Sequence, residues 1–228
     1  MSGQTPWNEL FPEMPKEFQM PFWYSSLQSF WLFFPADPDV VASLLPKLPA
    51  GRGLRVARFE ELWDRCLVSL DFQVYTSGWS SGLAATREIE FNAYVYPEAR
   101  EPWVPYMPWP EYVRGTDQTK TIGGLRLHVP CDNPVAIEAG IELFGEPKFL
   151  ASFAYTVPSP NSPEVTTWSY GVYDPLPSPP PPEPPSDKLV FQVDADLQGL
   201  PHVTGNSTPL VEYGVIVRSA SPRLVGNV

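Results

Sequence analysis

The 228-residue sequence is poor in the residue types that usually build metal sites. It has two histidines, His128 and His202, and two cysteines, Cys66 and Cys131, scattered over the chain. Transition-metal sites usually draw three or four ligands from these residue types. The short Gly123-Gly124 pair also lacks the lysine and hydroxyl residue of a phosphate-binding loop. We therefore expect no metal and no cofactor.

Basic residues and long apolar runs are scarce as well. The chain has 15 Lys and Arg against 26 Asp and Glu, a formal net charge of −11, which opposes binding to nucleic acid or anionic lipid. No run approaches the ~20 apolar residues of a membrane span, and the opening MSGQTPWNEL lacks the features of a secretory signal. We expect no nucleic-acid or membrane partner, a cytoplasmic location, and free buried thiols rather than a disulfide.

Proline, by contrast, is abundant, with 30 residues among 228, more than twice the usual share of ~5%. Proline breaks helix interiors, so this content argues against a helical bundle. Apolar residues make up 43% of the chain, enough for the core of a single domain over residues 1–228. We expect a Pro-rich loop at 175–187, as a stiff spacer or a partner-docking ligand.

A second Pro-rich stretch, residues 97–118, also contains four aromatic residues and has no helical or strand periodicity. Long loops of this kind in compact domains are usually functional or disordered, and so many aromatic residues disfavour disorder. Trp103 and Trp109 within it are candidate substrate-binding residues if the loop is a lid. The same aromatic residues would equally suit a subunit interface, where Trp and Tyr are enriched.

Periodicity predicts a β-rich α+β domain, either a curved sheet or an open barrel. One short helix is expected at 40–45, capped by Asp37 with Pro38 in its first turn. A second is expected to begin at Pro134 and to end at Gly145. The expected strands are 23–34, 66–75, 87–96, 125–130, 149–157, 165–173, 189–193 and 211–217.

Residues 132–150 are the most informative segment. Asp132 or Asn133 caps the helix, Gly145 stops it, and Lys148 follows Pro147 within an apolar run. Lysine is costly to bury. Lys148 is therefore either a solvated surface residue or an amine held for chemistry.

The stretch Asp132-Asn133-x-x-Ala136-Ile137-x-x-Gly140-x-Glu142-Leu143, followed by Pro147-Lys148, resembles the signature of the acetoacetate decarboxylase family. Looser similarity extends over about residues 25–157. The resemblance implies a cone-like β-barrel, a Schiff-base lysine and assembly into homo-oligomers. It places Lys148 on the Schiff-base lysine, Glu88 on one active-site glutamate and Asp71 near the other, which makes these three the candidate catalytic residues.

This sequence departs from the family pattern where basic residues are expected. Phe149 stands where active decarboxylases usually carry a second lysine, and Ile141 replaces an arginine of the motif. Neither Leu27 nor Gln28 is basic, although an arginine that holds the substrate carboxylate belongs near them. Glu146 stands where an aromatic residue is common.

A Schiff base requires a neutral amine, but a free lysine has a pKa of about 10.4. Without a second lysine, desolvation by Phe144, Phe149 and Phe153 would have to lower that pKa. An inward Glu146 would oppose this effect, so we favour an outward orientation, while the inward one stays open. Phe149 and Glu146 join Trp103 and Trp109 as candidate substrate-binding residues.

Other acidic residues have simpler interpretations. We interpret Glu90 as part of an exposed strand face, and Asp71 could merely bond backbone near a strand end. Three functions remain: a lysine Schiff-base lyase acting on a β-keto acid or related carbonyl compound; a non-decarboxylating aldolase, dehydratase or cyclase on the same scaffold; and a non-catalytic small-molecule binding protein.

Overall fold

The computed structural model describes residues 23–79, 82–159, 161–162, 164–174, 188–200, 211–215 and 224–227. The expected Pro-rich loop at 175–187, the N-terminal 22 residues and His202 lie outside these ranges. Both cysteines are described, and both are free and buried, as expected.

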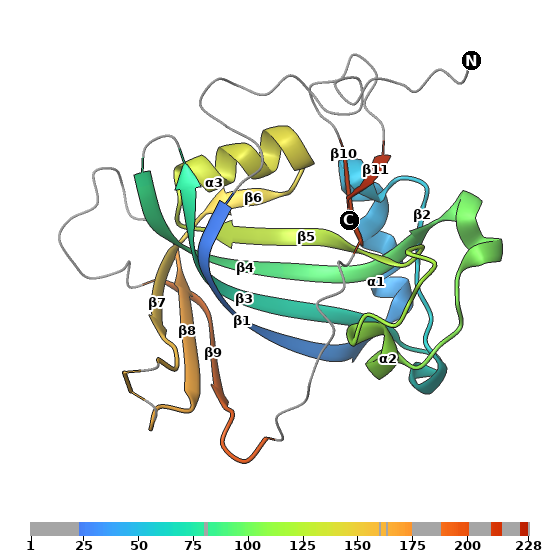
Figure 1. Ribbon diagram of the computed structural model, residues 1–228. Helices are drawn as coiled ribbons and strands as arrows, with labels where there is room; N and C mark the ends of the chain where they lie inside the picture. The colour runs from blue at the N-terminus through green and yellow to red at the C-terminus, as the bar shows by residue number, and fades with distance from the viewer. Residues whose placement is uncertain are drawn as a thin grey trace, which may run out of the picture.

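One large sheet dominates the fold (Figure 1). Its three long antiparallel strands are adjacent and curve together. The strand order is β1 (Trp23–Ala36), β3 (Cys66–Trp79), β4 (Gly82–Pro97), β5 (Gly123–Cys131), β10 (Val211–Val215) and β11 (Leu224–Asn227), with β2 (Leu54–Val56) paired to β4 and β6 (Lys148–Leu150) paired to β5.

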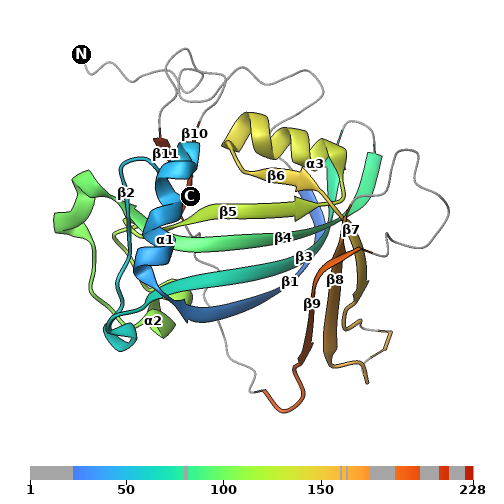
Figure 2. The same ribbon diagram turned by 180° about the vertical axis from the view of Figure 1, so that it is seen from behind.

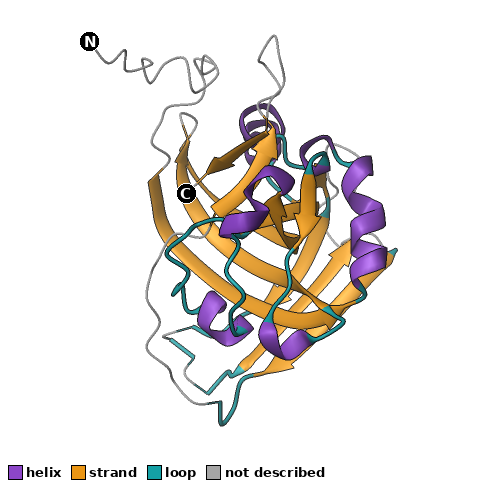
Figure 3. Ribbon diagram, turned by 90° about the vertical axis from the view of Figure 1, so that its right-hand side faces the viewer, coloured by secondary structure: helices purple, strands orange, loops and turns teal. Residues whose placement is uncertain are grey.

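A separate three-stranded antiparallel sheet contains β7 (Ser152–Thr156), β8 (Thr167–Tyr173) and β9 (Leu189–Asp196). The helices are few and short: α1 (Pro38–Leu44), α2 (Trp109–Val113) and α3 (Pro134–Ala139), which continues as a π-helical turn over Gly140–Phe144. Short 3-10 segments occur at Leu45–Lys47, Pro49–Gly51, Glu60–Leu62 and Glu98–Trp103. Figure 3 shows how strands outnumber helices.

The expected class, a β-rich α+β domain with a curved sheet, is confirmed. Closure into a barrel is not detected, because no pairing among the described strands joins β1 to β11. No helix in the described part of the chain is long and apolar enough to cross a membrane.

Strand alternation gives the large sheet two different faces, because successive side chains point to opposite sides. On one face, Val68 packs under α1 and Phe72 packs under the smaller sheet. Figure 2 shows α1 crossing the strands on that side. The other face of β3 carries Ser69, Asp71 and Gln73, so its centre is polar.

Helices α1 and α3 begin where the sequence predicts. Asp37 accepts hydrogen bonds from the backbone N–H groups of Asp39 and Val40 and begins α1 at Pro38. Asn133 accepts from Val135 and Ala136 and begins α3. Asp132, the other candidate cap, instead pairs with Arg87, at 2.6 Å between Oδ2 and Nε.

The segment 97–118 is not the structureless loop that was expected. It contains the 3-10 segment Glu98–Trp103 and helix α2, which begins after Pro108 with Pro110 in its first turn. Proline suits a first helical turn because it needs no hydrogen-bond donor there. Trp109 packs in a cluster around Phe59 and Tyr112, so part of the segment belongs to the core.

Candidate active site

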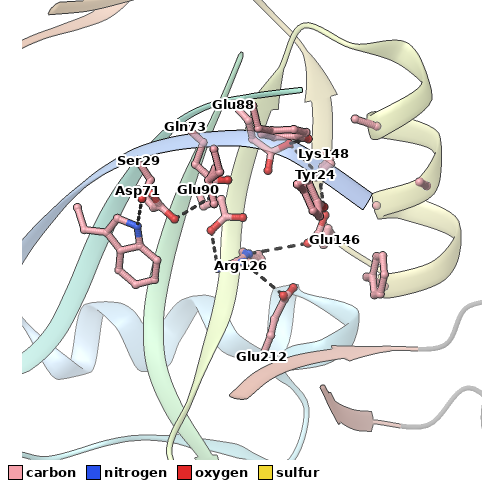
Figure 4. A pocket seen from close by; sticks show the side chains of 17 residues that line it. Tyr24, Ser29, Asp71, Gln73, Glu88, Glu90, Arg126, Glu146, Lys148 and Glu212 are labelled. Carbon is pink, nitrogen blue, oxygen red and sulfur yellow. Dashed lines mark hydrogen bonds and ion pairs between the residues drawn. The ribbon is translucent and has the colours of Figure 1, made fainter. Parts of the chain in front are cut away.

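A cavity of about 360 Å³ opens on the polar face of the large sheet. Strands β1, β3, β4, β5, β6 and β10 and the α3 segment all contribute side chains to its wall (Figure 4). The residues that line it are Tyr24, Leu27, Ser29, Trp31, Asp71, Gln73, Tyr75, Glu88, Glu90, Arg126, Ala136, Ala139, Gly140, Phe144, Glu146, Lys148 and Glu212.

Strand register brings the acidic residues together. Glu88 and Glu90 are two residues apart on β4 and therefore point to the same face. Asp71 on β3 lies directly opposite Glu90, and Gln73 lies opposite Glu88. The interpretation of Glu90 as exposed was wrong: it is 5% exposed, because its face of β4 lines the cavity rather than the surface.

Lys148, the first residue of β6, enters this cavity. Its Nζ lies 2.9 Å from Glu88 Oε2 and 3.1 Å from Glu146 Oε2, and the side chain is 8% exposed. The surface-lysine interpretation is thereby excluded. Tyr75 adds a contact that the sequence did not reveal, since its hydroxyl donates to the same Glu88 oxygen at 3.3 Å.

The charge state of Lys148 differs from the expectation. Burial lowers the pKa of Lys148, but the carboxylates of Glu146 and Glu88 outweigh it, and the pKa stands well above its usual value. Lys148 is therefore an ammonium in the resting protein. The outward orientation favoured for Glu146 was wrong, because this residue turns inward and contacts Lys148.

Arg126 is the main residue that sequence reasoning missed. Its guanidinium contacts Glu90 at 2.8 Å, Glu212 at 3.2 Å and Glu146 at 3.8 Å. An arginine in the apolar strand Leu125-Arg126-Leu127 was the available signal, since burial of arginine requires partners. Glu212 comes from β10, far away in sequence, and carried no signal.

Burial raises the pKa of three of the carboxyl groups in the cavity. Burial raises the pKa of Asp71 to about 7 and that of Glu212 to about 8, despite the nearby Arg126. Burial also raises the pKa of Glu90 well above its usual range. The Glu146 carboxyl is different: burial raises its pKa, but Lys148 and Arg126 outweigh burial and lower it overall.

These shifts predict that stability declines as pH rises. Asp71 and Glu212 bind protons more tightly in the folded than in the unfolded chain, so their stabilisation is complete below about pH 4. It is lost as pH rises through about 7 to 8. We expect the free energy of unfolding of the wild type, measured in urea, to fall from pH 5 to 8. In Asp71→Asn and in Glu212→Gln this decrease should be smaller than in the wild type by at least about 1 kcal/mol. Glu138→Gln, which changes an exposed carboxyl of α3, should keep the wild-type dependence of the unfolding free energy on pH. An equal dependence in all four proteins would refute the assignment of the effect to Asp71 and Glu212.

Gly140 leaves the space that Lys148 occupies. A Cβ at this position would lie 2.5 Å from Lys148 Cδ and 2.5 Å from Glu146 Oε2. Both atoms belong to buried, ion-paired side chains and cannot move aside freely. The glycine of the sequence signature therefore has a packing role beside the lysine.

Gly140→Ala should consequently displace Lys148 and lower the melting temperature by several degrees. Helix propensity alone predicts the opposite sign, a gain of about 0.5–1 kcal/mol for alanine. The matched control is Gly124→Ala on β5, where the nearest atom would be 3.9 Å away. Thermal unfolding of the two variants checks this, and a more stable Gly140→Ala protein would contradict the packing role.

Several residues expected at the site lie elsewhere. Phe149 points away from Lys148 along β6 and is 47% exposed, while Trp103 is 58% exposed. Trp109 and Phe153 pack in other clusters. None of residues 97–118 lines the cavity, so the segment does not cover it as a lid. Among the three phenylalanines expected to desolvate Lys148, Phe144 alone lines the cavity.

The cavity offers carboxyl groups but no grouping suited to a metal. No set of three or more histidine, cysteine, aspartate or glutamate side chains within the described ranges could hold a metal ion. The arrangement supplies instead an amine, a carboxylate in contact with it and a guanidinium nearby. These groups are suited to covalent carbonyl chemistry and proton transfer.

Comparison with known proteins establishes the fold. No protein-family model and no curated protein matches the sequence. Among solved structures, the enduracididine biosynthesis enzyme MppR complexed with pyruvate matches with a TM-score of 0.58 and 14% identity, over 92% of this chain and 70% of that one. A structure of acetoacetate decarboxylase matches with a TM-score of 0.56 and 16% identity, over 95% of this chain and 68% of that one.

A third structure, MppR complexed with the condensation product of pyruvate and imidazole 4-carboxaldehyde, matches with a TM-score of 0.52 and 14% identity, over 92% of this chain and 70% of that one. The chain therefore has the fold of acetoacetate decarboxylase and of MppR. This confirms, at the level of the fold, the resemblance carried by residues 132–150.

Proposed function

We propose that this chain is an enzyme that forms a Schiff base between Lys148 and a small carbonyl compound, and that it acts as a lyase of the acetoacetate decarboxylase type. One observation carries the proposal: the buried side chain of Lys148 lines a cavity, and its Nζ lies 2.9 Å from Glu88 Oε2. Pyruvate bound to MppR, which has the same fold, supports a carbonyl ligand.

Because Lys148 rests as an ammonium, Glu88 acts first as a base. It accepts one proton from Lys148, and the neutral amine then forms a carbon–nitrogen bond to the carbonyl carbon. The resulting carbinolamine loses its hydroxyl group as water, using the proton that Glu88 holds. The products are an iminium on Lys148, one water molecule and the Glu88 carboxylate, so charge and protons balance.

The iminium then serves as an electron sink. With a β-keto acid, the bond to the carboxylate breaks and its electron pair moves to the iminium nitrogen as carbon dioxide leaves. A proton from solvent adds to the enamine carbon, and addition of water to the resulting iminium returns a ketone and free Lys148. Tyr75, which donates to Glu88, holds the proton carrier in place.

A second candidate is carbon–carbon bond formation by the same enamine. The condensation product bound to MppR favours this candidate. Here Glu88 removes a proton from the carbon next to the iminium, and the enamine attacks the carbonyl carbon of an aldehyde. The new alkoxide takes the proton from Glu88, and water then releases the product from Lys148. Release of carbon dioxide from acetoacetate distinguishes the first candidate from the second. Assembly into homo-oligomers stays a prediction in both.

Borohydride reduction followed by mass mapping tests the Schiff base. The protein is incubated with acetone, pyruvate or acetoacetate at pH 7 to 9.5, reduced and digested. We expect the stable adduct at Lys148, with a yield that rises with pH because the neutral amine becomes more populated. Lys47 and Lys120, which do not line the cavity, report non-specific labelling. Adducts spread equally over the three lysines would exclude the proposal.

A further inference from the structure

Carboxyl groups outnumber bases in the wall of the Lys148 cavity. Five carboxyl groups face two basic groups among the described residues that line it: Asp71, Glu88, Glu90, Glu146 and Glu212 against Arg126 and Lys148. Both bases are already engaged. Lys148 contacts two carboxylates and Arg126 contacts three.

Asp71 carries the clearest unmet interaction. It is 2% exposed, and its Oδ2 accepts a hydrogen bond from Gln73 at 2.8 Å. Its Oδ1 accepts no hydrogen bond from an N–H group or a hydroxyl group within the described part of the chain, and the Glu90 carboxyl is the other side chain that shares a hydrogen bond with Asp71. A buried acceptor of this kind costs free energy unless a donor satisfies it. An incoming ligand that carries a donor would do so.

An aromatic ring lies at the same end of the cavity. Trp31 on β1 is the strand partner of Asp71 and lines the cavity with it. The indole N–H of Trp31 donates to Ser29 Oγ at 3.1 Å and therefore does not satisfy Asp71. A carboxyl group beside an indole ring is a combination that binds organic cations, by charge and by cation–π attraction.

We propose that the Asp71 and Trp31 end of the cavity binds a positively charged group of the substrate, an ammonium or a guanidinium, while Lys148 binds its carbonyl group. The inference rests on the proposed function for the carbonyl end. It narrows the substrate class to basic carbonyl compounds. A substrate with an anionic tail would meet no free base in the described wall.

The charges around Asp71 are consistent with this role. Arg126 of β5 and Glu88 of β4 act on it by charge, and Glu90 of β4 shares a hydrogen bond with it. Burial raises the pKa of Asp71 to about 7, so the carboxyl group is partly neutral without a ligand. A bound cation would favour its ionised form, and a proton would leave to solvent.

Strand geometry sets the length of the substrate. Glu88 lies opposite Gln73, and Glu90 lies opposite Asp71, so the Lys148 end and the Asp71 end are two residues apart along the sheet. That separation is about 7 Å. A spacer of about three methylene groups between the carbonyl carbon and the cationic nitrogen covers most of this distance, and the contact between the cation and the Asp71 carboxylate covers the rest.

Three methyl ketones with the same three-methylene spacer and with tail groups of different charge test the inference. They are 5-(trimethylammonio)pentan-2-one, its uncharged isostere 6,6-dimethylheptan-2-one and the anionic 5-oxohexanoate. Binding is measured by calorimetry, and imine formation by borohydride reduction and mass mapping. We expect the cationic ketone to bind and to be trapped at least tenfold better than the isostere, and 5-oxohexanoate to be the poorest of the three.

Two variants test whether Asp71 and Trp31 cause the preference for the cationic ketone. Asp71→Asn, which resembles the protonated carboxyl group, and Trp31→Leu should each reduce the ratio of cationic to uncharged binding at least fivefold; thermal melts verify that both variants fold. An unchanged ratio in both, or better binding of 5-oxohexanoate than of the cationic ketone, would overturn the inference and leave the Schiff base intact. Selective binding of the cation without any adduct at Lys148 would instead refute the proposed function and support the cation site.

Discussion

Replacement of Lys148 by alanine is expected to abolish borohydride-dependent labelling in the cavity, at least a thousandfold below wild type. The label forms a covalent bond to an amine, and no other amine among the described residues lines the cavity. A cavity that acted only by positioning its ligand would keep its activity after this change. Labelling is measured as the intact-mass shift after reduction with acetone or acetoacetate, and turnover as carbon dioxide release from acetoacetate.

The same variant should also be less stable. Removal of Lys148 leaves Glu88 and Glu146 buried without their cation, and loss of one partner from a buried ion pair costs about 3–5 kcal/mol. A double variant, Lys148→Met with Glu146→Gln, removes a carboxylate together with the ammonium and should recover part of this loss. It provides a folded protein without the amine, and labelling of its cavity would contradict the assignment of Lys148.

Replacement of Glu146 by glutamine should have the opposite effect on reactivity. Glu146 lies 3.1 Å from the ammonium and is the first of the carboxylates that raise the pKa of Lys148. Loss of a neighbouring opposite charge typically moves a pKa by about 1–3 units. The neutral amine at pH 7 should therefore become about 10 to 1,000 times more abundant, and adduct formation should shift to lower pH.

The rate of adduct formation from pH 6 to 10 measures this shift. Glu212→Gln is the matched control, because Glu212 contacts Arg126 and hydrogen-bonds Glu146 but is not among the carboxylates that raise the pKa of Lys148. It should change the rate less than threefold. An identical pH profile for wild type and Glu146→Gln would mean that Glu146 does not hold the proton on Lys148. Such a result would contradict the charge state inferred from the ion pairs.

Local sequence signals predicted the elements around Lys148 well. Asn133 caps α3 as expected, and its amide also donates to Thr86 Oγ1 at 2.8 Å, which ties the helix to β4. Gly145 ends the π-helical turn with a left-handed φ of 67°, a conformation that favours glycine. These features depend on neighbours in the chain, so one sequence was enough to identify them.

The charge balance of the site could not be predicted in the same way. Arg126, Glu146 and Glu212 meet in space from β5, the turn before β6 and β10. Their pairing depends on strand register and on a parallel contact between β5 and β10, neither of which has a local signature. For this reason the sequence suggested an apolar pocket that lowers the pKa of a lysine, whereas the structure has an acidic pocket that raises it.

The aromatic segment 97–118 illustrates a different limit. Its composition correctly indicated order, but composition does not show which face of the sheet a segment covers. Tyr112 packs against Phe59 at 5.2 Å between ring centroids, and Trp109 packs against Phe33 at 6.3 Å. These contacts place α2 on the end of the sheet that is distant from Lys148 in the strand register. The alternative of a subunit interface remains a prediction for the exposed Trp103.

One spectroscopic measurement tests the central claim most directly. Protein labelled with ¹⁵N at the lysine Nζ atoms is mixed with a ketone labelled with ¹³C at its carbonyl carbon, and the bound carbon is observed by NMR from pH 7 to 10. The account predicts a carbon signal split by one-bond coupling to ¹⁵N, growing with pH and absent in Lys148→Ala. A bound carbon that shows no coupling to nitrogen at any pH would contradict a Schiff base at Lys148.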